Sequence, residues 1–444
     1  MAESTVAAIS TALGEGGIAI IRVSGPRAVQ ISTKILTRKN FDIPGKLYLT
    51  SLIDEHKNIL DKVLAVYFKC PNSYTGEDIL EIHTHGGIFI ARLCLELLLK
   101  SGAVLAQPGE FTRRAFINGR IDLSQAEGVL GIIKAQSVEA LKASARTLNG
   151  GLSKIIQDVH EKILNIQANI EINLDFPEGE IFDGNFDLSR EIFCVIEELE
   201  KLLSRCEAGM IFNNGVKITI AGRPNVGKSS LLNAILEKDR AIVTEIPGTT
   251  RDIISETILI NSLPVILSDT AGIRETENII EAEGVKLAMK AASEGDLCLF
   301  VIDGSKKITD EEINFINSLD DKIIIVINKS DLEQAANFKT TRKKIYVSAK
   351  NKTGIEELKQ AIYDKAIKTP AAGGELNASA AQLQDIRESL NAMREAHGLA
   401  EKNFEPDIIA ALLNDARVKL MRVLGIEIGD ELLDYMFNRF CVGK

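Results

Sequence analysis

The stretch ITIAGRPNVGKSS at residues 218–230 joins an apolar strand pattern to a glycine-bounded loop and to the helical segment LLNAIL. The spacing G-x-x-x-x-G-K-S from Gly222 to Ser229 is that of a phosphate-binding loop. Glycine lets the backbone curl until its N–H groups face an anion, and the N-terminus of the following helix adds partial positive charge. The pattern predicts that Lys228 contacts the β- and γ-phosphates of a nucleotide and that the Ser229 hydroxyl ligates Mg²⁺.

Residues 211–370 around this loop alternate predicted strands with helices, which is typical of a doubly wound α/β domain. Fully apolar runs such as IIIVI at residues 323–327 suit central parallel strands that are buried on both faces. The strands are expected at residues 217–221, 256–260, 265–269, 297–303, 323–328 and 344–347.

Two motifs after the loop are placed to contact Mg²⁺ and the γ-phosphate. The first is GTTRD at residues 248–252, where a threonine hydroxyl can ligate Mg²⁺ while a γ-phosphate is present and release it after hydrolysis. The second is DTAG at residues 269–272, which ends an apolar run. We expect Asp269 to reach the metal through water and the Gly272 N–H to contact the γ-phosphate.

Two further motifs are placed to recognise a guanine base. NKSD at residues 328–331 ends an apolar strand, and its carboxylate, Asp331, can accept two N–H bonds from the Watson–Crick edge of guanine. Adenine offers no matching pair of donors. SAK at residues 348–350 ends another strand and is expected to close over the base. Five motifs in this order, all at strand ends, predict a GTPase.

The catalytic position is unusual. Many Ras-like proteins place a glutamine after DTAG to orient the attacking water, but this chain has Ile273 there. Either hydrolysis is very slow or another group acts, and the nearby candidates are Arg274, Glu275, Glu277 and Glu281.

Asn225 in the phosphate-binding loop admits two interpretations. Its amide oxygen can hold a monovalent cation beside the phosphates, where the cation replaces an arginine, or its side chain can simply cap the loop.

Residues 1–120 show the pattern of an α+β domain, with strands expected at 18–23, 47–53, 63–68 and 79–83 and a helix over 88–102. Arg22 and Glu81 interrupt two of these strands. A charge there is costly unless it is paired, faces solvent or meets a ligand. For His83 and His85, which alternate on one strand, structural roles are favoured over a metal pair because no carboxylate or cysteine stands at ligand spacing.

The remaining segments, 121–210 and 375–444, are predicted to be helical. Ser124 and Glu127 match a capping box, which predicts one long helix up to about Asn149. The aromatic C-terminus, FCVGK, is expected to dock rather than fray. Further helices are expected at about residues 151–174, 188–208, 379–402, 406–424 and 429–437.

Composition limits the class of protein. A chain of 444 residues suggests about two to four domains. The net charge of −10 excludes a basic nucleic-acid-binding coat, so any RNA contact needs a local patch or a partner. The six cysteines show no paired spacing and are expected to be reduced thiols. The N-terminus lacks a signal-peptide pattern and no apolar run approaches about 20 residues, so we expect a soluble cytoplasmic protein.

The chain resembles the MnmE (TrmE) family of tRNA-modification GTPases essentially from end to end. The phosphate-binding loop is shared with many GTPases, whereas the N-terminal blocks and the terminal FCVGK are specific to this family. The matching motifs are GEGGIAIIRVSG at 14–25, PNSYTGEDILEIHTHGG at 71–87, PGEFTRRAFINGRIDLSQAE at 108–127, DFPEGEI at 175–181, GRPNVGKSSLLNAI at 222–235 and AIVTEIPGTTRD at 241–252.

The resemblance implies a folate-binding and dimerisation domain over residues 1–120, a helical domain from residues 121–210 and 375–444, and an inserted Ras-like G domain over residues 211–370. It implies a homodimer that forms a heterotetramer with the FAD-dependent partner MnmG. Together they add an aminomethyl or carboxymethylaminomethyl group to C5 of the wobble uridine of certain tRNAs. The one-carbon unit comes from a tetrahydrofolate derivative (5-formyl- or 5,10-methylene-), and GTP hydrolysis needs K⁺ and G-domain dimerisation.

The resemblance also implies roles for individual residues. Folate contacts are implied at Arg22, Glu81, Lys444 and Arg120, the last standing where some relatives have lysine. Mg²⁺ ligands are implied at Ser229 and Thr250, and K⁺ ligands at Asn225, Thr244, Ile246 and Thr249. Glu281 matches the glutamate that orients the catalytic water, with Glu283 as a competing assignment, and Cys441 is either a functional thiol or a buried structural one. The full GTP-binding set is Asn225, Val226, Gly227, Lys228, Ser229, Ser230, Thr244, Glu245, Ile246, Pro247, Gly248, Thr249, Thr250, Asp269, Thr270, Ala271, Gly272, Asn328, Lys329, Ser330, Asp331, Ser348, Ala349 and Lys350.

Two other functions fit parts of the sequence. A ribosome-assembly-type switch GTPase shares NVGKSSLLN and GTTRD, but it leaves residues 1–210 unexplained. A folate-binding scaffold with a degenerate G domain is disfavoured by the intact Lys228, Asp269 and Asp331.

Overall fold

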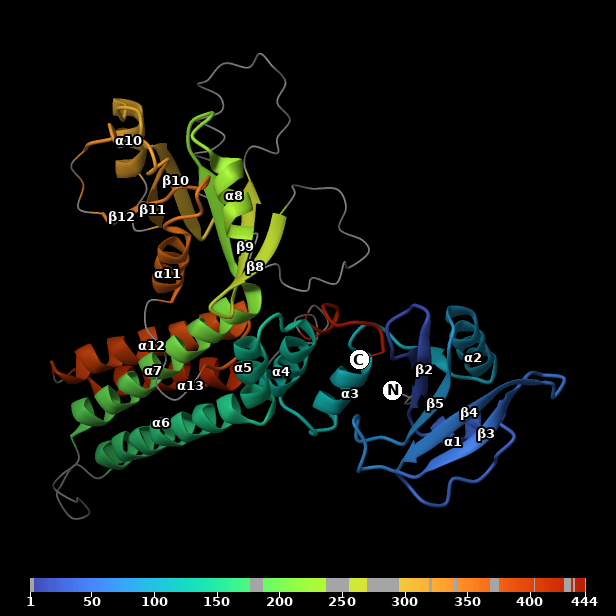
Figure 1. The fold of residues 1–444 in the computed structure, drawn as a ribbon. Coiled ribbons are helices and arrows are strands. Elements are labelled where there is room, and N and C mark those ends of the chain that lie inside the picture. The colour runs from blue at the N-terminus through green and yellow to red at the C-terminus, as the bar shows by residue number, and fades with distance from the viewer. Residues whose placement is uncertain are drawn as a thin grey trace. The chain divides into compact units, whose positions relative to one another are not determined.

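The computed structural model describes residues 4–175, 187–236, 255–269, 295–318, 322–338, 340, 342–367, 375–402, 404–426, 433 and 436–443 (Figure 1). The chain divides into two compact units. The first comprises residues 1–126, 156–175 and 406–444, and the second comprises residues 127–155 and 176–405. Within the described ranges, no helix combines the length and apolar character needed to cross a membrane.

The first unit is built on a six-stranded sheet with the order β3-β4-β5-β2-β1-β6. All neighbouring strands are antiparallel except β1 and β6, which are parallel. The strands are β1 (Val6–Ile9), β2 (Gly16–Ser24), β3 (Leu47–Ile53), β4 (Ile59–Phe68), β5 (Ile79–Gly86) and β6 (Val104–Leu105). The four predicted strands are confirmed, whereas β1 and β6 were not predicted from the sequence.

Among the described residues, six helices belong wholly or partly to this unit. They are α1 (Ala28–Ser32), α2 (Ile88–Lys100), α3 (Glu110–Ile117), the start of α4 (Leu123–Lys134), part of α6 (Gly151–Asp175) and α13 (Pro406–Val423). Apolar side chains of α1 and α2 pack on the sheet in one core with the fully buried Ile21, Val23 and Ile82. The apolar residues that alternate along β2 and β5 therefore contribute to this core.

The second unit contains a six-stranded sheet with the order β12-β11-β10-β7-β9-β8. Its strands are parallel except for the β8–β9 hairpin. They are β7 (Val216–Ala221), β8 (Ser255–Ile260), β9 (Leu263–Asp269), β10 (Leu297–Asp303), β11 (Ile323–Asn328) and β12 (Lys344–Tyr346). All six predicted strands are confirmed, and every residue of β10 and β11 is buried, as expected for central parallel strands.

Helices cover both faces of this sheet. Helices α8 (Lys228–Leu236) and α11 (Ile355–Ala366) contribute to one core with Leu299 and Val301, and α10 (Asp310–Ser318) contributes to another with Phe300 and Ile302. Because successive side chains of a strand point to opposite faces, β10 supplies both cores. This is the doubly wound arrangement that the sequence predicted.

The helical segment after residue 120 differs from its prediction. The expected single helix is two helices, α4 (Leu123–Lys134) and α5 (Val138–Leu148). Ser137 caps α5 by accepting a hydrogen bond from the Ala140 N–H at 3.1 Å. The capping box of α4 is also displaced: Asp122 accepts from the Gln125 N–H at 2.9 Å, and Gln125 Oε1 accepts from the Asp122 N–H at 3.0 Å. Ser124 lies inside the helix instead of capping it.

Two more of the described helices belong to the second unit. Helix α7 runs from Leu188 to Asn214, past its predicted end near Ala208, and only Gly215 separates it from β7. Helix α12 (Ala380–Ala400) begins with a complete capping box of Ser379 and Gln382. The predicted helix at 429–437 lies largely outside the described residues.

The chain that follows the second sheet returns to the helices through a buried polar junction at Asn377, which is 7% exposed. The Asn377 N–H donates to Thr147 Oγ1 at 2.8 Å, and the Thr147 hydroxyl donates to the Asn377 carbonyl at 3.0 Å. Asn377 Nδ2 donates to the Glu127 carbonyl at 3.1 Å, and Asn213 Nδ2 donates to Asn377 Oδ1. The Asn377 side chain therefore ties the returning chain to α4 and α7, and the Asn377 backbone ties it to α5.

Replacing Asn377 by alanine removes the side-chain bonds to Glu127 of α4 and Asn213 of α7, at a cost of about 1–3 kcal/mol of local stability. The expected result is faster hydrogen exchange in α4 and α7 and a lower melting temperature. Asn391→Ala, on the exposed surface of α12, is the matched control and should change neither. Unchanged protection in Asn377→Ala would contradict this role of the junction.

Candidate functional site

The phosphate-binding loop connects the end of β7 to the start of α8. Three of its residues have positive φ: Gly222 (146°), Asn225 (64°) and Gly227 (94°). A Cβ on Gly222 would lie 2.4 Å from the Val301 carbonyl oxygen, so only glycine fits against β10. The predicted order of strand, loop and helix is confirmed.

Lys228 lies over this loop. Its Nζ donates to the carbonyl oxygens of Gly222 and Arg223, both at 2.9 Å. Ser229 and Ser230 follow in the exposed first turn of α8, and Val226 is buried beneath the loop. An ammonium and a helix N-terminus therefore converge where an anion is to be bound.

Asn328, at the end of β11, connects the phosphate-binding loop to the SAK segment. Its side chain is 2% exposed. Nδ2 donates to the Val226 carbonyl at 2.8 Å, and Oδ1 accepts from the Ala349 N–H at 3.1 Å. Two motifs separated by more than a hundred residues are thus held together by one buried amide.

Lys329 joins the same group through its long side chain. Its Nζ donates to the Asn225 carbonyl at 3.2 Å and pairs with Asp303 Oδ2 at 2.7 Å. Burial alone would raise the pKa of Asp303, but hydrogen bonds from Lys329 and Ser305 outweigh it and lower the pKa. Sequence reasoning missed Asp303; the available signal was a carboxylate that ends a wholly apolar strand.

Asp331 is held at the edge of the site by Ser348, whose Oγ donates to Asp331 Oδ1 at 2.6 Å. This hydrogen bond lowers the pKa of Asp331 and keeps the carboxylate ionised. Ser348 also accepts from the Asn351 N–H at 3.1 Å, and the Ser330 N–H donates to the Val347 carbonyl at 3.1 Å. NKSD and SAK therefore form one rigid group, with an exposed carboxylate suited to the two N–H donors of guanine.

Of the GTTRD and DTAG motifs, the structure describes only Asp269, and only its backbone. This residue ends β9 and pairs with Ile220 of β7, so DTAG begins next to the phosphate-binding loop. The following predicted residues lie outside the described residues: Thr244, Glu245, Ile246, Pro247, Gly248, Thr249, Thr250, Thr270, Ala271, Gly272, Glu281 and Glu283.

A second group of charged residues lies on the sheet of the first unit. Arg22 on β2 and Glu81 on β5 stand directly opposite each other, and Arg22 Nε donates to Glu81 Oε1 at 2.8 Å. Their side chains are 19% and 13% exposed. The Arg22 guanidinium also lies 5.5 Å from the ring centroids of both Tyr74 and Phe111. Aromatic faces and a carboxylate thus surround this arginine.

Glu81 also has a second partner, His83 Nε2, at 3.4 Å. Burial alone would raise the pKa of Glu81, but the His83 hydrogen bond and the Arg22 charge outweigh it, so the pKa lies below its ordinary value. His85 instead bonds Asp61, with Nδ1 2.6 Å from Oδ1. The two histidines therefore have different carboxylate partners, and in the described part of the chain no three histidine, cysteine or acidic side chains gather as a metal site would require.

One other predicted folate residue, Arg120, lies in the described part of the chain. Arg120 is exposed beside the loop before β5, where a Cβ on Gly76 would lie 3.1 Å from Arg120 Cγ. The C-terminal segment docks on the first unit, as expected: Phe440 is 6% exposed, and the Gly109 N–H donates to the Cys441 carbonyl at 3.4 Å. Gly443 packs against Ile9, so closely that a Cβ would lie 2.4 Å from the Ile9 carbonyl oxygen.

The docked segment also places two predicted residues. Cys441 is exposed, which excludes the buried structural thiol as its role in this structure. Lys444 lies outside the described residues.

Comparison with known proteins gives consistent matches over the whole chain. The family model described as "GTP-binding protein TrmE N-terminus" matches residues 5–120, and the "MnmE helical domain" model matches residues 123–441. Two proteins called "tRNA modification GTPase MnmE" are similar from end to end. The protein from Carboxydothermus hydrogenoformans is 42% identical, with 100% of both chains covered. The protein from Geobacter sulfurreducens is 41% identical, with 100% of this chain and 99% of the relative covered.

Asp331→Asn should weaken GTP binding roughly ten- to hundredfold, because an amide cannot accept two N–H bonds as the carboxylate does. The same variant should gain affinity for xanthosine triphosphate, whose C2 oxygen accepts the new amide N–H. Equilibrium titration with fluorescent analogues of both nucleotides measures the change. Asp364→Asn on the exposed face of α11 is the control, and equal GTP affinity in wild type and Asp331→Asn would contradict the assignment.

Proposed function

The chain belongs to the MnmE family of tRNA modification GTPases, and on this premise we propose that it couples GTP hydrolysis to modification of C5 of the wobble uridine of certain tRNAs. The single observation that supports GTP binding in this proposal is the set of hydrogen bonds made by Asn328, which brings the phosphate-binding loop, NKSD and SAK into one site. The ribosome-assembly alternative is not retained, because the N-terminal family model matches residues 5–120.

In this proposal the G domain binds GTP with Mg²⁺ at Ser229 and Thr250 and with K⁺ at Asn225, Thr244, Ile246 and Thr249. Potassium held by these ligands would supply positive charge where negative charge develops between the β- and γ-phosphates, and Glu281 would orient the attacking water in place of the glutamine that the chain lacks. The position of Asn225 supports this: it is exposed, at a tight positive-φ turn of the loop, with its carbonyl held by Lys329.

The first unit binds the tetrahydrofolate derivative that supplies the one-carbon group. The contacts are Arg22, Glu81, Arg120 and Lys444. The Arg22–Glu81 pair supports this assignment, because two partly exposed charges in a sheet otherwise built on apolar alternation have the form of a ligand site. Aromatic rings around Arg22 suit a planar, conjugated ligand, and an exposed Arg120 suits its carboxylates.

The working assembly is a homodimer bound to the FAD-dependent protein MnmG, and tRNA is bound by this complex. The chemistry on uridine takes place at the joint complex, and the exposed Cys441 lies on the segment that also carries Lys444. The net charge of −10 supports a shared tRNA site, because this chain alone offers no overall attraction for a polyanion.

Hydrolysis of GTP should be strongly faster in KCl than in NaCl at matched ionic strength, and Asn225→Gly should abolish the difference. Glycine is the suitable replacement because it accepts the φ of 64° while removing the amide. The rate of phosphate release measures the effect. Equal slow rates in both salts for the wild type would mean that Asn225 only caps the loop.

Glu281→Ala should lower the turnover number by about 10²-fold or more while leaving nucleotide affinity nearly unchanged, because the water is bound productively only with the carboxylate present. Glu283→Ala is the matched control, since it stands two residues away and is the competing assignment. A large loss of GTP affinity in Glu281→Ala would show that Glu281 has a structural role. A loss of turnover found only in Glu283→Ala would assign the water-orienting role to Glu283 instead.

Deleting the gene should remove the C5 modification from wobble uridines, and the intact gene should restore it. Mass spectrometry of nucleosides from purified tRNAs measures this, and complementation with Lys228→Ala tests whether the GTPase activity is required. Unchanged wobble uridines in the deletion strain would overturn the proposed function.

A further inference from the structure

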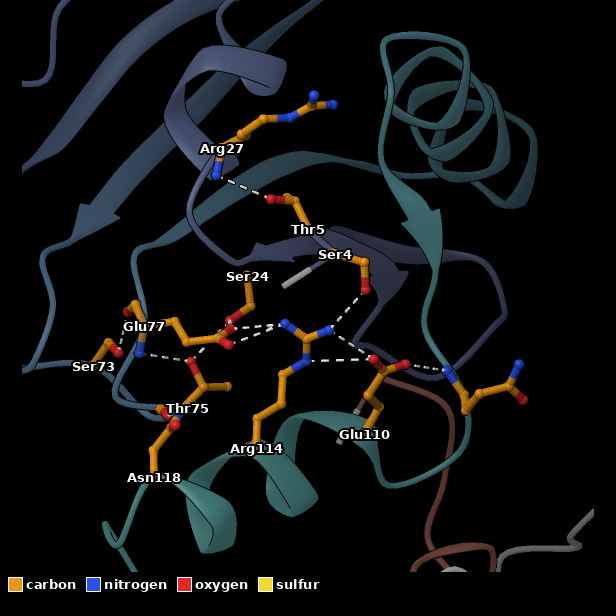
Figure 2. Close-up of polar contacts among 11 residues, drawn as sticks. Ser4, Thr5, Ser24, Arg27, Ser73, Thr75, Glu77, Glu110, Arg114 and Asn118 are labelled. Atoms are coloured by element: carbon orange, nitrogen blue, oxygen red, sulfur yellow. Dashed lines mark hydrogen bonds and ion pairs between the residues drawn. The ribbon is translucent and has the colours of Figure 1, made fainter. Parts of the chain in front are cut away.

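One arginine of the first unit is enclosed by carboxylates next to the proposed folate residues. Arg114 lies on α3, and its guanidinium is between Glu77 and Glu110 (Figure 2). Nη1 donates to both oxygens of Glu77 at 3.1 and 3.0 Å, and Nη2 and Nε donate to Glu110 Oε1 at 2.9 and 3.3 Å. The three side chains are 14%, 15% and 19% exposed. Two carboxylates thus neutralise Arg114, which leaves it little charge for an anionic ligand.

Glu77 belongs to the loop between β4 and β5, and its carboxylate has a second anchor. Ser24 at the end of β2 donates its hydroxyl to Glu77 Oε2 at 2.7 Å and lies 2.8 Å from Thr75 Oγ1. Ser24 and Thr75 are fully buried. Asn118 Nδ2, beyond the end of α3, donates to the Thr75 carbonyl at 2.7 Å. Figure 2 shows these contacts as one continuous network from β2 through the loop to α3.

The loop that this network fixes contacts two proposed folate residues. Tyr74 places its ring against the Arg22 guanidinium and its hydroxyl 2.9 Å from Thr112 Oγ1 of α3. Gly76 has φ of 75° and packs against the aliphatic part of Arg120. A shift of the loop would therefore move the surroundings of Arg22 and Arg120 together.

We propose that Arg114 is a positioning residue of the tetrahydrofolate site: its bridge between Glu77 and Glu110 sets the loop that orients Arg22 and Arg120. This inference rests on the proposed folate function. The bridge needs an arginine, because a planar guanidinium can bind both carboxylates with paired N–H groups, whereas the compact ammonium of a lysine cannot span both in the same way.

The test is the affinity of the full-length protein for 5-formyltetrahydrofolate, measured by calorimetric titration of wild type and Arg114→Lys. Coupling energies in such networks predict affinity weaker by about tenfold in the variant. Arg92→Lys, at an exposed position of α2, is the matched control and should bind like the wild type. GTP hydrolysis in KCl should be the same in all three proteins, because it reports on the other unit.

A double-mutant cycle separates positioning from general destabilisation. If Arg114 acts through Arg120, Arg114→Lys should cost clearly less affinity in an Arg120→Ala background than in the wild type. Glu110→Gln removes one carboxylate charge while keeping the shape of the side chain, and it should also weaken folate binding. This variant replaces Arg114→Lys in the test if Arg114→Lys does not fold.

The outcomes are distinct. Wild-type affinity in Arg114→Lys, or in Glu110→Gln when the first variant does not fold, overturns the positioning role alone. An equal loss of affinity from Arg114→Lys in the wild type and in Arg120→Ala overturns the inference that Arg114 acts through Arg120. An absence of binding by the wild type overturns the proposed folate function and this inference with it.

Discussion

The buried amide of Asn328 is the interaction on which the nucleotide site depends. An amide has both donor and acceptor ends, and here the donor fixes the phosphate-binding loop while the acceptor fixes the SAK segment. Burial makes both bonds obligatory, because an unpaired polar group in this position costs about 1–3 kcal/mol. The guanine end and the phosphate end of the site are therefore set at a fixed separation by one side chain of β11.

This constraint works because the central strands around it are parallel. Strands β7, β10 and β11 end at the same edge of the sheet, so Gly222, Asp303 and Asn328 come together although they are far apart in sequence. Lys329 adds an ionic contact by bonding both Asp303 and the Asn225 carbonyl. The apolar strands supply rigidity, and the chemistry is left to the loops that follow them.

The sequence predicted the elements with a strong local pattern and missed those decided by tertiary contact. Strands β10 and β11 were predictable because their apolar runs are continuous. Strand β1 was not, because half of the short run Val-Ala-Ala-Ile is alanine, which is depleted in strands, and the segment is held by pairing on both sides with β2 and β6. The break between α4 and α5 contains neither glycine nor proline and depends on the cap at Ser137.

The same distinction applies to the candidate sites. Motif order was enough to predict the phosphate-binding loop, NKSD and SAK, since each is local in sequence. The pairing of Arg22 with Glu81 joins residues 59 positions apart, so the sequence pattern alone favoured a salt bridge or a solvent-facing side chain over a ligand contact without deciding among them. The structure shows that the ion pair exists, and its incomplete burial is what makes a ligand role compatible with it.

In the first unit, the number of carboxylates that contact an arginine determines how much of its charge remains available to a ligand. Arg114 is paired with two carboxylates, so it holds parts of the protein together and has little charge left for a ligand. Arg22 has one, which it shares with His83, so part of its charge can act on a ligand. Arg120 is exposed at the rim of the same loop. Under the proposed folate function, the exposed Arg120, together with Lys444, would supply most of the attraction for an anionic ligand, and Arg22 would set its orientation, because Arg22 is already paired with Glu81.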